Sequence, residues 1–363
     1  MSVSTDVPAP LRILVVADVW QGSNAYAYLR AFRRRGHSVM VVPPEKYVPS
    51  SWQRKSLRAL RRLLEPRLVR EYTEALIDEA RHLRPHLFFV FKGRYVAPEA
   101  IRTIRELGAI AINVYPDVSF MAHGPYLPQA LPMYDWVFTT KSFGLTDLER
   151  LLGVRNASFV PHSYDPETHA PIELNDEDLG RYACDVSFIG TWSRKKQRLL
   201  EHVQSQLPAI RLRVWGAQWE KATSLGSSLE GGGVYGTEYA KSMVGSKINL
   251  AILSEVRLGA SSGDRTTSRT FHIPATGAFM LHERTKEFLE YFAEGVECAC
   301  FDAPDELVNK IGYYLDNDHE RLAVAAAGQR RCIESGYSVD VRAGEVLEKM
   351  AELRARRVEV LSA

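Results

Sequence analysis

The chain has 363 residues, of which 45% are hydrophobic and 25% are charged, as in ordinary globular proteins. Its 46 Lys and Arg nearly balance its 44 Asp and Glu, giving a formal net charge of +2, so bulk charge gives no indication of nucleic-acid binding. The length exceeds the usual size of one doubly wound domain, and two domains are expected.

The cysteines and the first residues indicate a protein of a reducing compartment. The chain has four cysteines: Cys184, Cys298, Cys300 and Cys332. They form no CxxC motif and have no histidines at the spacing of a metal site, so neither a disulfide framework nor a zinc site is expected. The N-terminus is polar and leads directly into a strand, without a cleavable signal pattern, and no segment has the apolar length of a membrane span. A cytoplasmic location is therefore expected.

The first half of the chain alternates apolar runs with helical patterns. Continuous apolar runs separated by helices are typical of parallel strands that are covered on both faces. The pattern predicts a Rossmann-like α/β domain with strands in the runs LRILVVAD (11–18), HSVMVV (37–42), HLFFVF (86–91), AIAINVY (109–115), WVFTT (136–140) and ASFV (157–160).

A second series of the same kind begins after residues 166–182, an acidic, proline-bearing segment without periodicity. Its strands are expected in DVSFIG (185–190), RLRVWG (211–216), KINLAIL (247–253), AFML (278–281) and VECACF (296–301). We therefore expect a first Rossmann-like domain in 1–168, a linker in 169–182, a second Rossmann-like domain in 183–338, and a C-terminal helix in 339–363 that crosses back to the first domain.

Polar residues follow the first two strands of the second series, where parallel sheets bind ligands. Gly190, Arg194 and Lys196 stand at the start of a predicted helix, which is a credible cradle for a diphosphate. A solvated helix start with surface lysines fits the same spacing. Gly216 ends the next strand, and Tyr235 further on offers a flat edge for a base, although such aromatics more often pack in a core.

A third corner is the stretch SRTFHIPATGAF (268–279), which predicts a short helix closed by a glycine and followed by a strand. Thr267 can cap this helix, while Arg265 and Arg269 place cations beside its positive end. Caps, arginines and a helix N-terminus together predict an anion-binding site.

These segments carry a resemblance to a known family. DVSFIGTWSRKKQ, SKINLAIL and SRTFHIPATGAFMLHERTKEFLEYF together resemble the CgeB-like group-1 glycosyltransferases, and YDWVFTTKSFGLTDLERLLG in the first half resembles them more loosely. The resemblance implies a GT-B fold, with two Rossmann-like domains facing each other across a cleft. It implies that the second domain binds a nucleotide-diphosphate sugar, that the acceptor comes from the first domain, that no metal or other cofactor is needed, and that the sugar is transferred with retention.

Carried over by position, Gly190 and Lys196 match the family's loop glycine and phosphate-binding lysine, and Arg269 falls beside the donor phosphates. His272 departs from the family, which usually has a ribose-binding glutamate there. An imidazole offers only one acceptor nitrogen when neutral, so it cannot accept from two hydroxyls as a carboxylate does. Three outcomes fit: His272 makes one ribose bond, Glu283 supplies the carboxylate, or the site is no longer catalytic.

The first domain offers one pair of candidate catalytic residues and one candidate surface. Asp117 and His123 follow a predicted strand and are the best acid/base candidates, although Asp117 could simply cap a turn and His123 lie in a loop. The basic stretch 54–70 is amphipathic and is compatible with peripheral contact at the inner membrane face, or with an ordinary solvated helix.

The leading functional hypothesis is a glycosyltransferase of polysaccharide biosynthesis or a related pathway, acting on a glycan, a glycolipid or a small-molecule acceptor. A non-catalytic GT-B protein that binds a nucleotide or glycan, or that serves as a scaffold, is the alternative from another class. A nucleotide-sugar epimerase ranks lower. A nicotinamide-dependent oxidoreductase ranks last, because the first βα turn has only one glycine, Gly22, where the dinucleotide fingerprint needs three.

Overall fold

The computed structural model describes the backbone of residues 10–48 and 58–362 and the side chains of residues 10–48 and 63–359. The chain divides into two units. The first comprises Met1–Val160, Leu258–Ser261 and Arg342–Ala363, and the second comprises Pro161–Arg257 and Ser262–Val341. Each unit is built around its own parallel sheet.

The sheet of the first unit has the strand order β2-β1-β3-β4-β5-β6, and all of its pairings are parallel. Each strand lies within one of the apolar runs that the sequence analysis identified. Their bounds are β1 (Arg12–Val16), β2 (Ser38–Val41), β3 (Leu87–Phe91), β4 (Ile110–Tyr115), β5 (Trp136–Thr139) and β6 (Ala157–Phe159).

Helices cover this sheet and complete its core. Tyr72 on α2 is fully buried, and its hydroxyl donates a hydrogen bond to the Val42 carbonyl at 2.9 Å. Ile101 and Ile104 on α3 are also fully buried in the same core. The helices of the unit are α1 (Asn24–Arg34), α2 (Arg58–Leu83), α3 (Pro98–Glu106), α4 (Tyr126–Ala130), α5 (Gly144–Leu152) and nearly all of α12 (Val339–Ser362).

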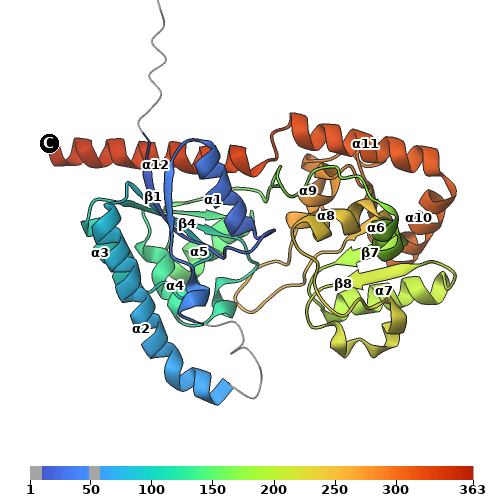
Figure 1. The fold of residues 1–363 in the computed structure, drawn as a ribbon, viewed down its shortest axis with the longest axis horizontal. Coiled ribbons are helices and arrows are strands. Elements are labelled where there is room, and N and C mark those ends of the chain that lie inside the picture. The colour runs from blue at the N-terminus through green and yellow to red at the C-terminus, as the bar shows by residue number, and fades with distance from the viewer. Residues whose placement is uncertain (1–9, 49–57, 363) are drawn as a thin grey trace, which may run out of the picture. The chain divides into compact units, whose positions relative to one another are not determined.

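Helix α12 joins the first unit although it ends the chain (Figure 1). Arg357 Nη2 lies 3.0 Å from Asp135 Oδ1, and Arg357 Nη1 donates to the Ala109 carbonyl at 3.1 Å. Lys349 Nζ lies 4.2 Å from the centre of the Trp136 ring, within the range of a cation–π contact. The prediction that the C-terminal helix returns to the first domain is confirmed.

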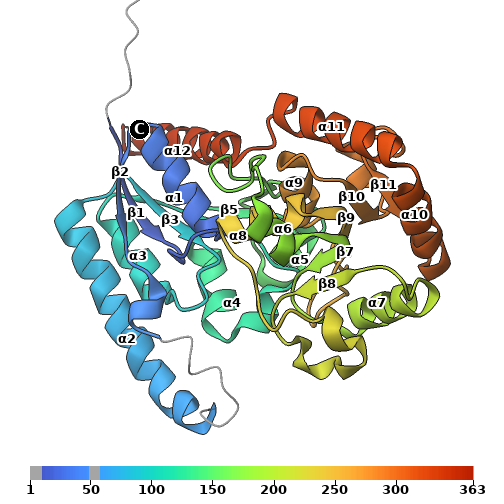
Figure 2. The same cartoon turned by 45° about the vertical axis from the view of Figure 1, so that its right-hand side comes forward.

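The sheet of the second unit has the order β11-β10-β9-β7-β8, again with parallel pairings (Figure 2). Its strands are β7 (Cys184–Ile189), β8 (Leu212–Trp215), β9 (Ser246–Ala251), β10 (Met280–Glu283) and β11 (Ala299–Phe301). Its helices are α6 (Asp176–Tyr182), α7 (Arg194–Gln206), α8 (Thr237–Val244), α9 (Ser268–Ala275), α10 (Pro304–Asp316) and α11 (Asp318–Glu334).

The segment that we predicted to be an irregular linker, 169–182, contains helix α6. Asn175 caps it, accepting from the Asp178 backbone N–H at 2.9 Å, while the Asp178 carboxylate pairs with Lys241 Nζ at 2.8 Å. A helix of 7 residues is too short to show hydrophobic periodicity, which is why the pattern did not indicate it. The boundary between the units also differs from the prediction, because it falls after Val160 rather than after 168.

Each sheet has one point where the strand order reverses. In the first sheet this point lies between β1 and β3, and in the second it lies between β7 and β9. Crevices outside the carboxyl ends of such strands are the usual ligand sites of open α/β sheets. Both candidate sites described below lie at these two points.

The carboxyl ends of β7 and β8 come unusually close together at two glycines. Gly216 has a φ of +140°, and a Cβ placed on it would lie 2.0 Å from the Gly190 carbonyl oxygen. The Gly190 N–H donates to the Trp215 carbonyl at 2.9 Å, and Trp219 Nε1 donates to the Gly190 carbonyl at 2.8 Å. Hydrogen bonds to Trp215 and Trp219 therefore fix the Gly190 backbone at the end of β7.

We expect Gly216→Ala to lower the free energy of unfolding by about 3 kcal/mol or more, because it combines a strained φ with a clash against backbone that cannot move aside. Chemical denaturation followed by circular dichroism measures the change. The control is Gly312→Ala in α10, where a Cβ meets nothing within 4 Å, and a gain of about 0.5–1 kcal/mol is expected there. Equal effects of the two substitutions would contradict the close-approach argument.

Candidate functional site

The first feature of the β7–β9 corner is a partly buried arginine, Arg269, that bridges two strand ends. Arg269 Nη1 donates to the Ile189 carbonyl at 3.2 Å, and its Nη2 donates to the Ile252 carbonyl at 2.7 Å. A Cβ on Gly190 would lie 2.8 Å from Arg269 Nη1, so only glycine leaves room for the guanidinium there. Arg269 Nε is buried without a hydrogen-bond partner among the described residues.

Lys196 adds a second cation in the first turn of α7. Lys196 is only 4% exposed, and its Nζ donates a hydrogen bond to the Thr191 carbonyl at 3.1 Å. Burial, and secondly the charge of Arg269, lower the pKa of Lys196 to about 8. The ammonium group is thus held in a place where it is poorly solvated and repelled by a neighbouring charge.

The carboxylates of Asp264 and Glu255 attract Lys196, and Asp264 also attracts Arg269, but neither carboxylate is in direct contact with either cation. Among the residues that the structure describes, neither Lys196 nor Arg269 forms an ion pair within 4.0 Å. Both stand at the carboxyl ends of β7 and β9, beside the N-terminus of a 13-residue helix whose dipole favours anions. The arrangement is complementary to a phosphate or diphosphate, which would supply negative charge at contact distance.

Two residues that were not predicted from the sequence, Lys195 and Glu255, lie at this corner together with the predicted Glu283. Lys195 Nζ forms an ion pair with Glu283 Oε1, and Glu283 Oε2 accepts from the Leu253 N–H at 2.9 Å. Glu255 Oε1 accepts from the Lys195 N–H at 3.2 Å. Both oxygens of Glu283 are therefore occupied. The run of three basic residues, 194–196, was the only sequence feature that indicated a role for Lys195. Nothing in the sequence indicated a role for Glu255.

The remaining predicted donor residues are spread around this corner. Thr267 is the N-cap of α9, and its N–H donates to Thr270 Oγ1 at 3.0 Å. Arg265 is partly exposed and lies 3.8 Å from Glu287. Arg194 is exposed at the start of α7, and Tyr235 is 57% exposed. Gly216 supports the Gly190 backbone, as described above.

His272 lies in the interior of the second unit. Its Nε2 lies 3.1 Å from the Ser163 carbonyl, so this nitrogen carries the proton, and Nδ1, at 3.3 Å from the Tyr239 hydroxyl, accepts. Its ring stacks on His169 with centroids 3.7 Å apart. Burial lowers the pKa of His272 to about 3, which keeps the ring neutral. In this arrangement neither nitrogen is left for a ribose hydroxyl.

In the first unit, Asp117 interacts with both Lys92 and His123. Its Oδ2 lies 2.7 Å from Lys92 Nζ and 2.9 Å from His123 Nε2. Burial acts to raise the pKa of Asp117, but the hydrogen bond and charge of His123 and the charge of Lys92 outweigh burial and hold the pKa well below its usual range. Asp117 is therefore a fixed carboxylate that orients His123 and Lys92, and it is a poor proton acceptor itself.

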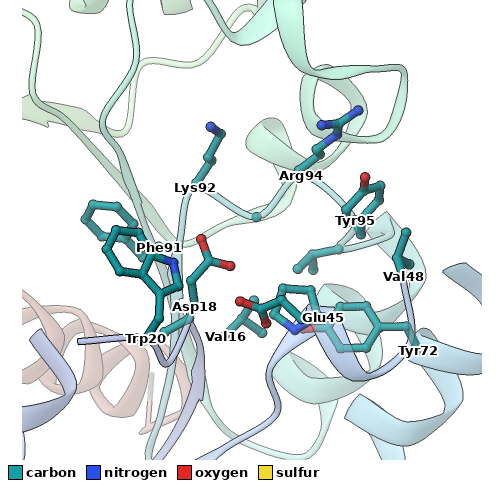
Figure 3. A pocket seen from close by; sticks show the side chains of 14 residues that line it. Val16, Asp18, Trp20, Glu45, Val48, Tyr72, Phe91, Lys92, Arg94 and Tyr95 are labelled. Carbon is teal, nitrogen blue, oxygen red and sulfur yellow. The ribbon is translucent and has the colours of Figure 1, made fainter. Parts of the chain in front are cut away.

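The first unit also contains a pocket of about 310 Å³ at its own reversal point, between the ends of β1 and β3 (Figure 3). Val16 and Tyr72 contribute apolar wall, and Trp20 stands at the edge with 46% of its surface exposed. Two carboxyl groups, from Asp18 and Glu45, face the middle of the pocket (Figure 3). The sequence analysis did not select this pair, although Asp18 directly follows a predicted strand.

The predicted membrane surface lies only in part within the described residues. Residues 54–57 and the side chains of 58–62 fall outside them. Further along α2, Leu63 is 75% exposed, and Arg67 pairs with Glu71 at 3.0 Å. Of the helices that the structure describes, none has both the length and the apolar character needed to cross a membrane. Peripheral contact of residues 54–70 with a membrane stays a prediction.

Comparison with known proteins finds a family model that is similar to part of the second half of the chain. Residues 194–348 match a family model described as glycosyl transferase-like. The match covers somewhat less than half of the chain, includes both cations of the β7–β9 corner, and confirms the resemblance to glycosyltransferases. No curated protein is significantly similar in sequence.

Solved structures extend the likeness of this glycosyltransferase-like chain to both units. Sucrose-phosphate synthase from Thermosynechococcus elongatus has a TM-score of 0.66 at 12% identity, covering 94% of this chain and 99% of that one. A glycosyltransferase from Rickettsia africae has a TM-score of 0.65 at 11% identity, and the match covers 95% of this chain and 99% of that one. Anabaena HepE, solved with UDP-glucose, has a TM-score of 0.61 at 12% identity, and the match covers 93% of this chain and 100% of that one. At such identities the likeness shows the fold, and the predicted GT-B fold class is confirmed.

We expect Lys196→Met to leave the protein as stable as the wild type or more stable at pH 7, because it removes a poorly solvated charge. The pKa of Lys196 is about 8 in the folded chain and about 10.4 in the unfolded chain, so the unfolded chain binds more protons between these values. Wild-type stability therefore rises with pH in this window, and the advantage of the variant shrinks as the pH rises through about 8.

Thermal melts at pH 7 and pH 9.5 check this expectation. The matched control is Arg198→Met, which removes an exposed cation from the same helix and is expected to change stability by less than about 0.5 kcal/mol at either pH. A variant at Lys196 that is clearly less stable at pH 7 would show that the lysine is a structural residue rather than a strained binding group.

Proposed function

We propose that this chain is a glycosyltransferase that takes its sugar from a nucleoside-diphosphate donor bound at the β7–β9 corner. The observation that carries the proposal is a pair of cations, the buried Lys196 and the partly buried Arg269, which form no ion pair within 4.0 Å among the described residues and stand beside a helix N-terminus. The glycosyl transferase-like family match over 194–348 supports it. HepE, a structural relative, has been solved with UDP-glucose, which makes a uridine donor the first to test.

The chemistry asked of this corner is stabilisation of a leaving group. In the transfer, the bond between the sugar C1 and the diphosphate oxygen breaks, and an acceptor oxygen forms the new bond to C1. Negative charge then grows on the departing diphosphate. Fixed cations and helix dipoles in a poorly solvated site stabilise such charge without reorganisation. Lys196, Arg269 and the α7 N-terminus would do this without a metal, and the described side chains include no group of three His, Cys, Asp or Glu that could hold one.

On the acceptor side, the structure separates the roles of Asp117 and His123 in the proposal. Since Asp117 is held as a carboxylate, it orients the imidazole, and His123 is the group that would accept the proton of the acceptor hydroxyl. If the transfer proceeds with retention, the leaving diphosphate can take that proton instead. Glycans, glycolipids and small molecules remain the proposed acceptors, and a cytoplasmic location, with contact at the inner membrane face, belongs to the same proposal.

One observation favours a second candidate function. His272 occupies the place of the family's ribose-binding glutamate, and both of its nitrogens are engaged by Ser163 and Tyr239. A corner that keeps its phosphate-binding cations without a ribose clamp suits a protein that binds nucleotides without transferring sugar. Such a protein would bind a nucleoside diphosphate and would not consume the donor.

Calorimetric titration with UDP, GDP, dTDP, ADP and CMP, in the presence of a chelator, tests the donor site. We expect saturable binding of one nucleoside diphosphate. Lys196→Met should weaken it on the order of 10- to 100-fold, because a charge-assisted hydrogen bond to phosphate is lost. Arg198→Met should bind as the wild type does. Binding of none of the five nucleotides, or equal binding by the Lys196 variant, would refute the proposed site.

A second prediction concerns turnover. We expect His123→Ala to lower acceptor-dependent consumption of the donor by about 100-fold, in the range of general base catalysis, and to leave nucleoside-diphosphate affinity unchanged. Release of the nucleoside diphosphate, measured with a coupled assay, follows the reaction. His82→Ala is the control, because this histidine is exposed near the end of α2. Full activity of the His123 variant would remove this residue from the mechanism.

A further inference from the structure

The pocket between the ends of β1 and β3 differs in charge from the donor corner. Its volume of about 310 Å³ is at the low end of the roughly 300–1,000 Å³ typical of ligand sites, so it suits one small group rather than a nucleotide. It lies entirely within the first unit. The charged groups that face its middle are carboxyls.

These carboxyls belong to Asp18, at the end of β1, and to Glu45, in the short 3₁₀ helix 44–46. Neither forms an ion pair with a cation within 4.0 Å among the described residues, and Glu45 Oε2 is buried without a hydrogen-bond partner. Burial, and secondly the hydrogen bond and charge of Asp18, raise the pKa of Glu45 to about 7. Glu45 is therefore partly protonated in the neutral range.

The two cations in the pocket wall are directed elsewhere. Lys92 Nζ is paired with Asp117 at 2.7 Å, and the Arg94 guanidinium lies 5.0 Å from the centre of the Tyr95 ring. Figure 3 shows both side chains extending away from Asp18 and Glu45. The positive charge that would balance the carboxyl pair is thus missing from the pocket wall.

We propose that this pocket binds an acceptor that carries a protonated amine, with the ammonium group held between Asp18 and Glu45. An ammonium group has three N–H donors and one positive charge, so it can donate to both carboxylates and balance their charge. A hydroxyl group has one donor and no charge, and would leave one carboxylate unsatisfied. The exposed face of Trp20 at the edge of the pocket offers a flat apolar surface for the C–H face of a sugar ring.

This inference rests on the proposed function, since it names the acceptor class of the same enzyme as an amino sugar or a related amine-bearing polyol. It can be tested without any donor. The full-length protein is titrated calorimetrically with glucosamine at pH 6.5, and with glucose and N-acetylglucosamine as matched probes that lack a positive charge. We expect glucosamine to bind at least tenfold more tightly than either neutral sugar.

Binding should also release protons, which is measured by repeating the titration in two buffers with different enthalpies of ionisation. Asp18→Asn and Glu45→Gln should each remove both the preference for glucosamine and the proton release. Glu99→Gln, at an exposed carboxylate in the first turn of α3, should keep both. Thermal melts establish that each variant is folded.

Three outcomes would overturn the inference. They are equal affinity for charged and neutral sugars, a preference that survives both carboxyl substitutions, and tight binding of Mg²⁺ or Ca²⁺ by the same two carboxylates without amine binding. Each is distinguishable from failure of the proposed function, because nucleoside-diphosphate binding at Lys196 is measured separately. Nucleotide binding without an amine preference would leave the glycosyltransferase proposal standing and remove only the acceptor class.

Discussion

The β7–β9 corner of the second unit depends on the partly buried guanidinium of Arg269. Arg269 ties the carboxyl ends of β7 and β9 together through the carbonyls of Ile189 and Ile252, and Gly190 has no side chain, which leaves it room. A charge partly buried in this way is unfavourable unless something compensates it, and two carbonyl dipoles do so only in part. Lys196 adds a second cation at this corner. The proposed phosphate ligand would bring negative charge to both cations.

The two units share one topology but differ in the charge of their candidate ligand sites. Each has a parallel sheet with a single reversal of strand order, and the charged residues proposed to bind a ligand lie near that reversal. In the second unit these residues are cations, Lys196 and Arg269. In the first unit they are the carboxyl groups of Asp18 and Glu45. The fold supplies the same crevice twice, and the residues after the strands decide the charge of the ligand that each crevice can hold.

The sequence predicted most of the fold and part of the donor corner. Strands such as LRILVVA were evident because buried parallel strands are continuously apolar, and Lys196 was evident because a glycine turn and cations follow a strand. Contacts between distant segments could not be predicted. His272 contacts Ser163, which is 109 positions away, whereas the family resemblance had suggested a ribose as its partner. Asp18 and Glu45 become neighbours only through the packing of a short 3₁₀ helix beside β1.

The return of α12 to the first unit affects how the chain folds during synthesis. Asp135 Oδ1 accepts a hydrogen bond from Arg105 Nη2 at 2.6 Å, and both residues lie within the first 160 residues. Asp135 also forms an ion pair with Arg357, which lies on α12. The ribosome therefore delivers the entire second unit before the first unit is complete. Translation at roughly 5–20 residues per second leaves the nascent first sheet without its final helix for about ten seconds or more. During that interval the surface that α12 covers is open to chaperones, and the second unit, contiguous in sequence except for a four-residue loop, can finish folding first.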